Sequence, residues 1–205
     1  TRHGSRRELK IDLVAVSHIE QDVDYSTGHV DFKGDVVIDG TVKALFQVKA
    51  TGTVTIGGDV ESNAHVEAGG DILVNGGVHG HAELIAGGSV MAKFLQHASV
   101  HAGGDVEIGA YLFEASVKTG GHLLAGGKGE GSGRAVVGGL VWAAQGIEAP
   151  SLGSPSNPRL KVVVGIDPEQ VTQAERARAK LRAIEAREAE LLKMLGLKRF
   201  DARLI

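Results

Sequence analysis

Nine histidines and no cysteines limit the chemistry open to this chain of 205 residues. Without thiolates, disulfides and thiol catalysis are excluded, and a zinc site would need three or four histidine or carboxylate ligands. Aligning the sequence on its internal repeat places His81 and His97 in one column, with His79 and His101 nearby. Glu114, in the next repeat, is a candidate third ligand. Two stacked histidines fall short of a metal site, so we predict no metal and keep a histidine–metal enzyme as an alternative.

A glycine-rich segment, GGKGEGSGR at 126–134, invites comparison with phosphate-binding loops. A P-loop requires Ser or Thr directly after its lysine, where a helix begins. Here Lys128 is followed by Gly129, and no helical pattern begins. We therefore predict no nucleotide or other cofactor and no catalytic residues. We interpret the segment as a projecting loop that offers candidate contacts for a protein partner at Lys128, Glu130 and Arg134.

Three aspartates that follow glycine, Asp35, Asp71 and Asp105, resemble the ligands of calcium-binding solenoids. Such proteins place the ligand in regularly repeated positions. In this chain the column is interrupted by Thr53, Ser89 and His122. We therefore predict that these short polar side chains form hydrogen bonds at a corner of the fold and do not hold calcium.

A repeat of about 18 residues positions all these candidates. Its marker glycine recurs at positions 34, 52, 70, 88, 104, 121 and 139. An aliphatic column lies two residues later, at Val36, Val54, Ile72, Val90, Val106, Leu123 and Val141. Another column holds Val48, Val66, Leu84, Val100, Val117 and Val136. Because apolar and polar positions alternate, each unit predicts one coil of a parallel β-helix.

A sixfold beat of aliphatic residues also runs inside the repeat, from Val36 to Val90. Three such segments per coil predict a triangular cross-section. The glycines are then expected at corners, in a backbone conformation that a side chain would penalise. The alignment places Phe94 and Tyr111, as larger fillers of tightened coils, in the column of Val42, Val60 and Val78.

The repeat is expected to end near Ala149, because all four prolines follow it and proline cannot donate to a strand ladder. We predict four segments: a capping segment at 1–32, the β-helix at 33–149, a linker with a closing strand at 150–166, and a C-terminal helix in 167–205.

The helix is expected to start at Asp167 and Pro168, because Asp can cap the first turn and proline suits the first helical position. Its apolar residues follow the 3,4 spacing of a short coiled coil, interrupted at Glu188. This seam offers further candidate contacts, for a partner or for a second copy of the chain, at Leu181, Ile184 and Leu191.

The composition narrows the classes of partner. The formal charge is −3, without the basic excess that nucleic acid binding requires. No apolar run is long enough to span a membrane, and no secretory signal is recognisable, so we expect a cytoplasmic protein. Because the chain begins at Thr1 rather than Met, we also expect it to be part of a longer protein.

Two stretches resemble the flagellar assembly protein A (FapA) family of bacterial cytoplasmic proteins: IEQDVDYSTGHVDFKGDVVIDGTV at 19–42, and VVGGLVWAAQGIEAPSLGSPSNPRLKVVVGIDP at 136–168. The resemblance covers residues 9–168. It implies a right-handed parallel β-helix, similar to that of the bactofilins, followed by helical segments. It implies no catalytic residues, associates the chain with flagellar or cell-pole organisation, and implies an N-terminal domain before this point.

We therefore expect a non-enzymatic scaffold that binds protein partners. One alternative is a hexapeptide acyltransferase, whose left-handed β-helix shares the sixfold beat. Those enzymes favour a small residue after each aliphatic one, whereas this chain has Val37, Lys43 and Lys49. A second alternative is a bactofilin-like cytoskeletal element that assembles with itself.

Overall fold

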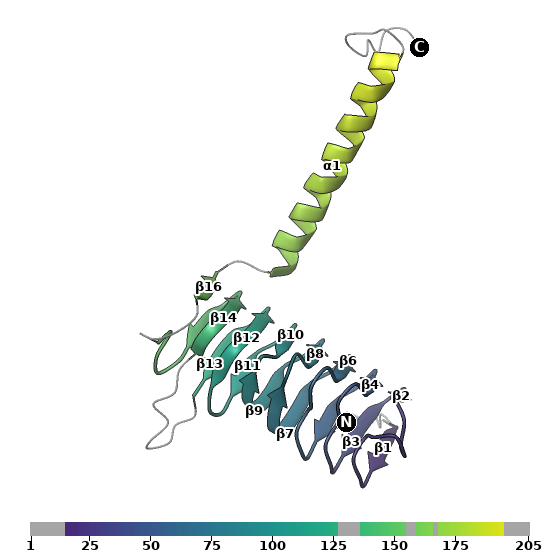
Figure 1. Cartoon of the computed structure of the whole chain (residues 1–205), viewed down its shortest axis with the longest axis vertical. Coiled ribbons are helices and arrows are strands. Elements are labelled where there is room, and N and C mark those ends of the chain that lie inside the picture. Colours follow the sequence, from purple (N-terminus) through teal and green to yellow (C-terminus); the bar gives the residue numbers. More distant parts are fainter. Residues whose placement is uncertain (1–14, 127–135, 155–158, 166–167, 195–205) are drawn as a thin grey trace, which may run out of the picture.

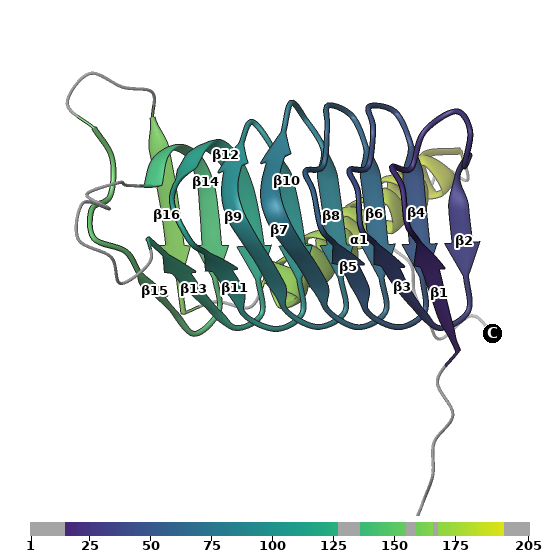
Figure 2. The same ribbon diagram turned by 90° about the horizontal axis from the view of Figure 1, so that it is seen from below.

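The chain forms a stack of parallel coils followed by one helix, α1 (Pro168–Met194) (Figure 1). The structure is a computed structural model that describes residues 15–126, 136–154, 159–165 and 168–194. Each coil lies on the next, and equivalent strands form continuous parallel ladders (Figure 2). Neighbouring residues across a ladder, such as Val36 and Val54, are about 18 positions apart. The predicted parallel solenoid with a C-terminal helix is confirmed.

Strands build two of the three faces of the solenoid. The first face contains β1 (Val16–Ile19), β3 (Asp35–Ile38), β5 (Val54–Ile56), β7 (Ile72–His79), β9 (Val90–Gln96), β11 (Val106–Ile108), β13 (His122–Ala125) and β15 (Gly146–Glu148). The second face contains β2 (Val30–Phe32), β4 (Gln47–Ala50), β6 (His65–Ala68), β8 (Glu83–Ala86), β10 (Ser99–Ala102), β12 (Leu112–Thr119), β14 (Val136–Ala143) and β16 (Leu160–Val164).

The third face contains regular strand only in the later coils, where four long strands are shared with a neighbouring face. β7 and β9 continue onto it from the first face, and β12 and β14 begin on it and continue onto the second face. One residue from each coil forms its ladder, and all of these residues except the exposed Leu152 are buried. Their order is Val23, Val42, Val60, Val78, Leu95, Leu112, Val136 and Leu152. Three parallel ladders therefore enclose the interior, as the sixfold beat predicted.

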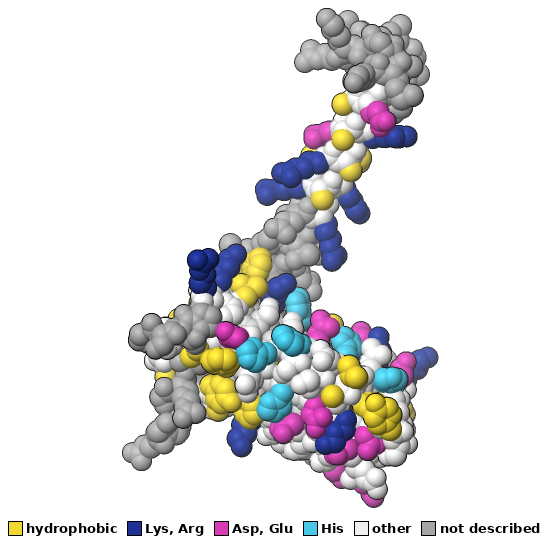
Figure 3. Space-filling view, in the orientation of Figure 1, with side chains coloured by type: hydrophobic (Ala, Val, Ile, Leu, Met, Phe, Trp, Pro, Cys, Tyr) yellow, Lys and Arg dark blue, Asp and Glu magenta, His cyan; other side chains and the backbone are white. Residues whose placement is uncertain are grey.

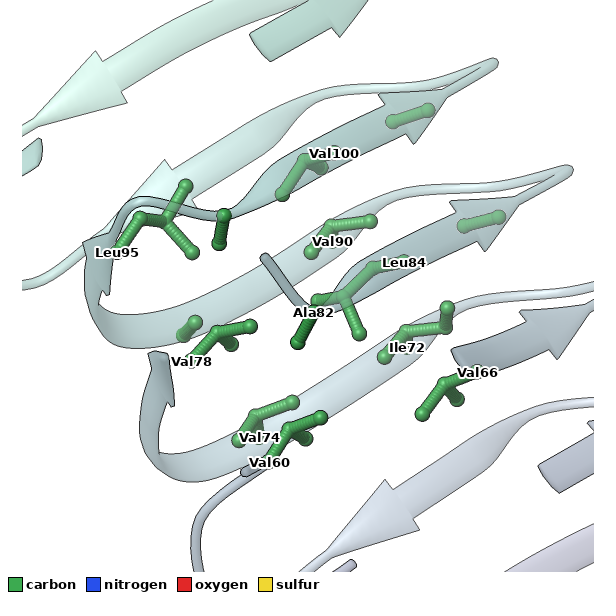
Figure 4. Packing of buried hydrophobic residues seen from close by; sticks show 14 of the residues in the cluster. Val60, Val66, Ile72, Val74, Val78, Ala82, Leu84, Val90, Leu95 and Val100 are labelled. Atoms are coloured by element: carbon green, nitrogen blue, oxygen red, sulfur yellow. The ribbon is translucent and has the colours of Figure 1, made fainter. Parts of the chain in front are cut away.

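The interior is filled by aliphatic side chains from all three faces (Figure 4). Ile72, Val78 and Leu84 lie six residues apart, one on each face, and all three are fully buried. Burying such a side chain stabilises the fold by about 1.5–3 kcal/mol. Phe46 is the one aromatic residue in this core among the residues that the structure describes. The sixfold beat therefore records one inward aliphatic residue per face.

The glycine doublets mark close contact between coils. A Cβ atom added to Gly87 would lie 2.3 Å from the carbonyl oxygen of Gly69, and one added to Gly88 would lie 2.1 Å from Oδ1 of Asp71. Neither Gly87 nor Gly88 has a positive φ. The predicted reason for this doublet, a backbone conformation that penalises side chains, is therefore wrong. Side chains are excluded here because the preceding coil leaves no room for a Cβ.

Left-handed backbone occurs instead at a corner occupied by ordinary residues. In five successive coils this corner has a positive φ, between 48° and 71°, at Leu45, Asn63, His81, His97 and Glu114. Such a φ is uncommon for residues other than glycine. Hydrogen bonds between coils hold it in place; for example, the N–H of His81 donates to the carbonyl of His97 at 2.7 Å.

The sequence alignment is wrong after the glycine-rich segment. Val141 pairs with Val117 on the second face and is not the equivalent of Leu123. Val136 pairs with Leu112 on the third face, not with a residue of the second. The last glycine doublet, at 138–139, lies 18 residues after the previous one and so matches the repeat spacing. The sixth coil is nevertheless longer than 18 residues, because Val117 pairs with Val141. The chain consequently returns to the stack on the third face.

The solenoid continues beyond its predicted end at residue 149. Leu152 forms a bridge with Val136, and β16 pairs along β14 as the last strand of the second face. The predicted strand after the linker is thus part of the stack. At the other end, residues 16–32 already form a coil, because β1 pairs with β3 and β2 pairs with β4.

Candidate partner-binding surfaces

Aspartate side chains connect coils by hydrogen bonds, as predicted. Each aspartate carboxylate accepts a hydrogen bond at 2.7 Å from the backbone N–H of the equivalent residue in the next coil. Thr53 donates to Asp35, Ser89 to Asp71 and His122 to Asp105. Between them, Ser89 Oγ accepts the N–H of Asp105 at 3.1 Å. Alternation with hydroxyl residues keeps the carboxylates two coils apart, which reduces repulsion between like charges.

The histidines predicted to stack do lie on adjacent coils. The ring centroids of His81 and His97 are 6.2 Å apart, and His97 Nδ1 lies 3.1 Å from a carboxylate oxygen of Glu114. Across the described ranges, no group of three or more His, Asp or Glu side chains is arranged to hold a metal ion. The column therefore places two imidazoles and one carboxylate together on the outside of the solenoid.

Phe94 and Tyr111 point outward, not inward as the alignment placed them. The inward column continues through Leu95 and Leu112, both fully buried. A shift of one residue along a strand reverses the face on which a side chain lies. Gly77 pairs with Phe94, and a Cβ on Gly77 would lie 2.1 Å from the Phe94 ring, so this glycine makes room for the aromatic side chain.

Six ring side chains consequently form one surface on the third face and its neighbouring corner, which we call the aromatic–histidine patch. Its members are His79, Phe94, Tyr111, His81, His97 and Phe113. In one row, Phe94 stacks on Tyr111 at 5.1 Å between centroids and meets the edge of His79 at 5.0 Å. In the other, His97 contacts Phe113 at 5.4 Å. These are favourable geometries for ring pairs.

The patch retains accessible surface. All its members are half-buried except His81, which is exposed. Glu114 beside it is also exposed, and its carboxylate pairs with His97. Half-buried rings that neighbouring coils hold in place lose little freedom when another surface covers them. The sequence signal that could have revealed the patch is an aromatic residue directly before each inward leucine, in Phe-Leu-Gln at 94–96 and in Tyr-Leu-Phe at 111–113.

The same face carries charged side chains in the earlier coils. Lys43 Nζ lies 3.0 Å from a carboxylate oxygen of Glu61 and 3.3 Å from one of Asp22. Hydrogen bonding with Glu61 and then with Asp22 raises the pKa of Lys43. The charged groups of this region are thus paired with one another across coils, which distinguishes it from the ring-lined patch.

We predict a pH-dependent contact at His18. Its Nε2 lies 3.0 Å from Oδ2 of Asp39, and this hydrogen bond together with the carboxylate charge raises the pKa of His18 above its ordinary value near 6.5. The contact therefore stabilises the fold fully below pH 6.5, and this contribution is lost as the pH rises through the raised pKa. In an NMR titration, His18 should have a midpoint above 6.5 that Asp39→Asn returns toward 6.5; equal midpoints would contradict the contact.

The helix exposes its apolar side chains. Leu181 is 56% exposed and Ile184 is 65% exposed, and the described side chains from 176 to 190 are all exposed. The remaining predicted contacts, namely Lys128, Glu130, Arg134 and the side chain of Leu191, lie outside the described residues. Within the described chain, no helix is long and apolar enough to cross a membrane.

Stacked parallel coils around an aliphatic interior, with paired polar groups on the outside, define the class of β-solenoid repeat proteins. The family model for the Flagellar Assembly Protein A beta solenoid domain matches residues 15–203. The chain belongs to this FapA family, which confirms the resemblance in the sequence. Comparison with curated proteins and with solved structures gave no match.

Proposed function

We propose that the chain is a non-enzymatic cytoplasmic scaffold in flagellar assembly that binds a protein partner on the aromatic–histidine patch. The observation that carries this proposal is the outward placement of Phe94, Tyr111 and Phe113, with His79 in contact with Phe94 and His97 in contact with Phe113. Aromatic side chains are enriched at protein interfaces and dominate their energetics. A function at the cell pole is part of the same proposal.

The charge of the solenoid favours a basic partner. Residues 15–165 carry 16 acidic and nine basic side chains, an excess of seven negative charges. An arginine can contact both an aromatic ring face and a neighbouring carboxylate, since ring faces attract cations. Glu114 lies beside the patch for such a contact. We therefore propose that the partner presents arginine side chains around an apolar anchor, and that salt weakens its association.

Capture from cytoplasmic extract tests the proposal. The baits are the chain and a version truncated after Gly165, which keeps all three ladders and removes α1. Mass spectrometry of the retained proteins should find the same partner on both, because the patch lies on the solenoid.

A partner retained by the full chain but lost on truncation would place recognition on the helix and contradict the assignment to the patch. If neither bait retained a protein above background, the scaffold function itself would be contradicted.

A further inference from the structure

The described side chains of helix α1, at 176–187, 189 and 190, are all exposed. Figure 1 shows the helix leading away from the last coils, and Figure 3 shows hydrophobic side chains along it with Lys and Arg beside them. Among these described side chains, one ion pair joins Arg187 and Glu190 at 3.0 Å. Most helical stability in proteins comes from packing an amphipathic face. The exposed Leu181 and Ile184 therefore require a cover.

The apolar positions of the helix follow a heptad. With Leu181 at position a and Ile184 at position d, the preceding a and d positions hold Ala174 and Ala177. Position g is then Lys180 and position e is Glu185, so that both positions beside the seam are charged. Glu188 interrupts the heptad at the next a position, where a polar residue lowers the stability of a coiled coil while fixing its register.

We propose that α1 pairs with α1 of a second copy of this chain as a parallel, in-register, two-stranded coiled coil. In this arrangement Lys180 lies next to Glu185 of the partner subunit, and symmetry makes the same contact twice. Glu188 at position a faces Glu188 of the partner subunit and lowers the stability of the pairing. The other g positions, Gln173 and Arg187, are opposite Arg178 and Leu192 of the partner subunit, so no like charges meet between g and e positions. Charge complementarity thus identifies a second copy as the occupant of the seam.

The antiparallel arrangement is less favourable. If Leu181 lies opposite Ile184 of the partner subunit, Lys180 faces Arg187 of the partner subunit twice, although Arg178 then faces Glu185 of the partner subunit. A shift of one heptad in either direction places Arg187 or Lys180 against its own counterpart. Each of these three antiparallel registers therefore brings like charges together at g or e positions, whereas the parallel register avoids such contacts between g and e positions.

Pairing gives the chain a property beyond binding one partner. Two solenoids held at the same end of a coiled coil present two aromatic–histidine patches. A partner that itself has two sites then gains affinity, because its second contact is intramolecular. The coiled coil does not depend on the patch, so either inference can fail alone.

Sedimentation equilibrium of the purified full chain, without any partner, tests this pairing. The wild-type chain should sediment as a dimer in a concentration-dependent manner. Lys180→Glu replaces two attractive contacts by two repulsive ones and should weaken dimerisation about tenfold, and adding Glu185→Lys should restore it. Arg182→Glu is the matched control, since position b lies away from the partner helix and should change dimerisation less than about twofold.

Circular dichroism of each variant checks that the solenoid remains folded. Stronger association of Lys180→Glu would indicate antiparallel helices and overturn the proposal. Equal weakening by Arg182→Glu would also overturn it, because the effect would then be one of general charge. A monomer at all concentrations would overturn it as well and would favour docking of the helix on the solenoid of its own chain.

Discussion

Gly87→Ala is expected to lower the free energy of unfolding by about 3 kcal/mol. The added Cβ would lie 2.3 Å from the carbonyl oxygen of Gly69, well inside van der Waals contact. Neither backbone can withdraw easily, because Gly87 N–H donates to Ala68 at 2.9 Å and Gly69 N–H donates to Ala50 at 3.0 Å. The two coils would have to separate, and their ladder hydrogen bonds would lengthen with them.

Gly109→Ala provides a matched control for this substitution. Its nearest neighbouring atom, the carbonyl oxygen of Lys93, would lie 3.7 Å from an added Cβ, and its φ is not positive. The change should therefore alter stability by less than about 0.5 kcal/mol or stabilise slightly, since alanine has a less flexible unfolded state. Urea unfolding, followed by circular dichroism, measures both variants. Equal losses would contradict the role of close contact between coils.

The stack of coils could be predicted from the sequence because its spacing is repeated. Residues such as Val36 and Val54 must remain equivalent to pair in a parallel ladder, so selection for an apolar interior leaves a visible period. The hydrogen bonds of Asp35 and its equivalents could be predicted for a related reason: a short acceptor recurs beside a backbone that turns at the same point in each coil.

Local departures from the period could not be predicted in the same way. A glycine doublet at 138–139 has the correct spacing from Gly121, yet the preceding segment had changed the number of residues in the coil. Phe94 and Tyr111 appeared to continue an inward column, although a one-residue shift places them outside. Register is decided by which residues are buried, and a bulky apolar side chain does not reveal this alone.

The cause of a residue type is also hidden from the sequence. In the sequence, a glycine such as Gly87 does not show whether it is needed for an unusual φ or for the lack of space for a Cβ. Only the structure of the neighbouring coil distinguishes the two causes. Conversely, His81 and His97 showed no sign that they occupy left-handed backbone. For the helix, the heptad predicted the seam of Leu181 and Ile184, and the structure leaves both side chains exposed.

Loss of the patch is expected to abolish partner capture. Tyr111→Ala combined with Phe113→Ala removes one ring from each row, namely the ring that stacks on Phe94 and the ring that contacts His97. If these rings are the anchors of the interface, the expected loss is about 2 kcal/mol, or about thirtyfold in affinity. Both side chains lie outside the core, whose inward residue at this place is Leu112, so the solenoid should remain folded.

Tyr25→Ala is the matched control for the patch variant. Tyr25 is 94% exposed and contacts Phe46 edge-on at 5.2 Å in the earlier coils, away from the patch. It therefore removes an exposed ring without changing the proposed interface. Thermal unfolding of all baits is needed beside the capture, so that a folded but inactive patch is distinguished from a damaged solenoid.

The most direct test of the scaffold compares three baits: the wild type, the patch variant and Tyr25→Ala. The quantity measured is the amount of partner that each bait retains from the same extract at equal loading. We expect the wild type and Tyr25→Ala to retain equal amounts and the folded patch variant to retain almost none. Retention of the partner by a folded patch variant, at the level of the wild type, would contradict recognition through the aromatic–histidine patch.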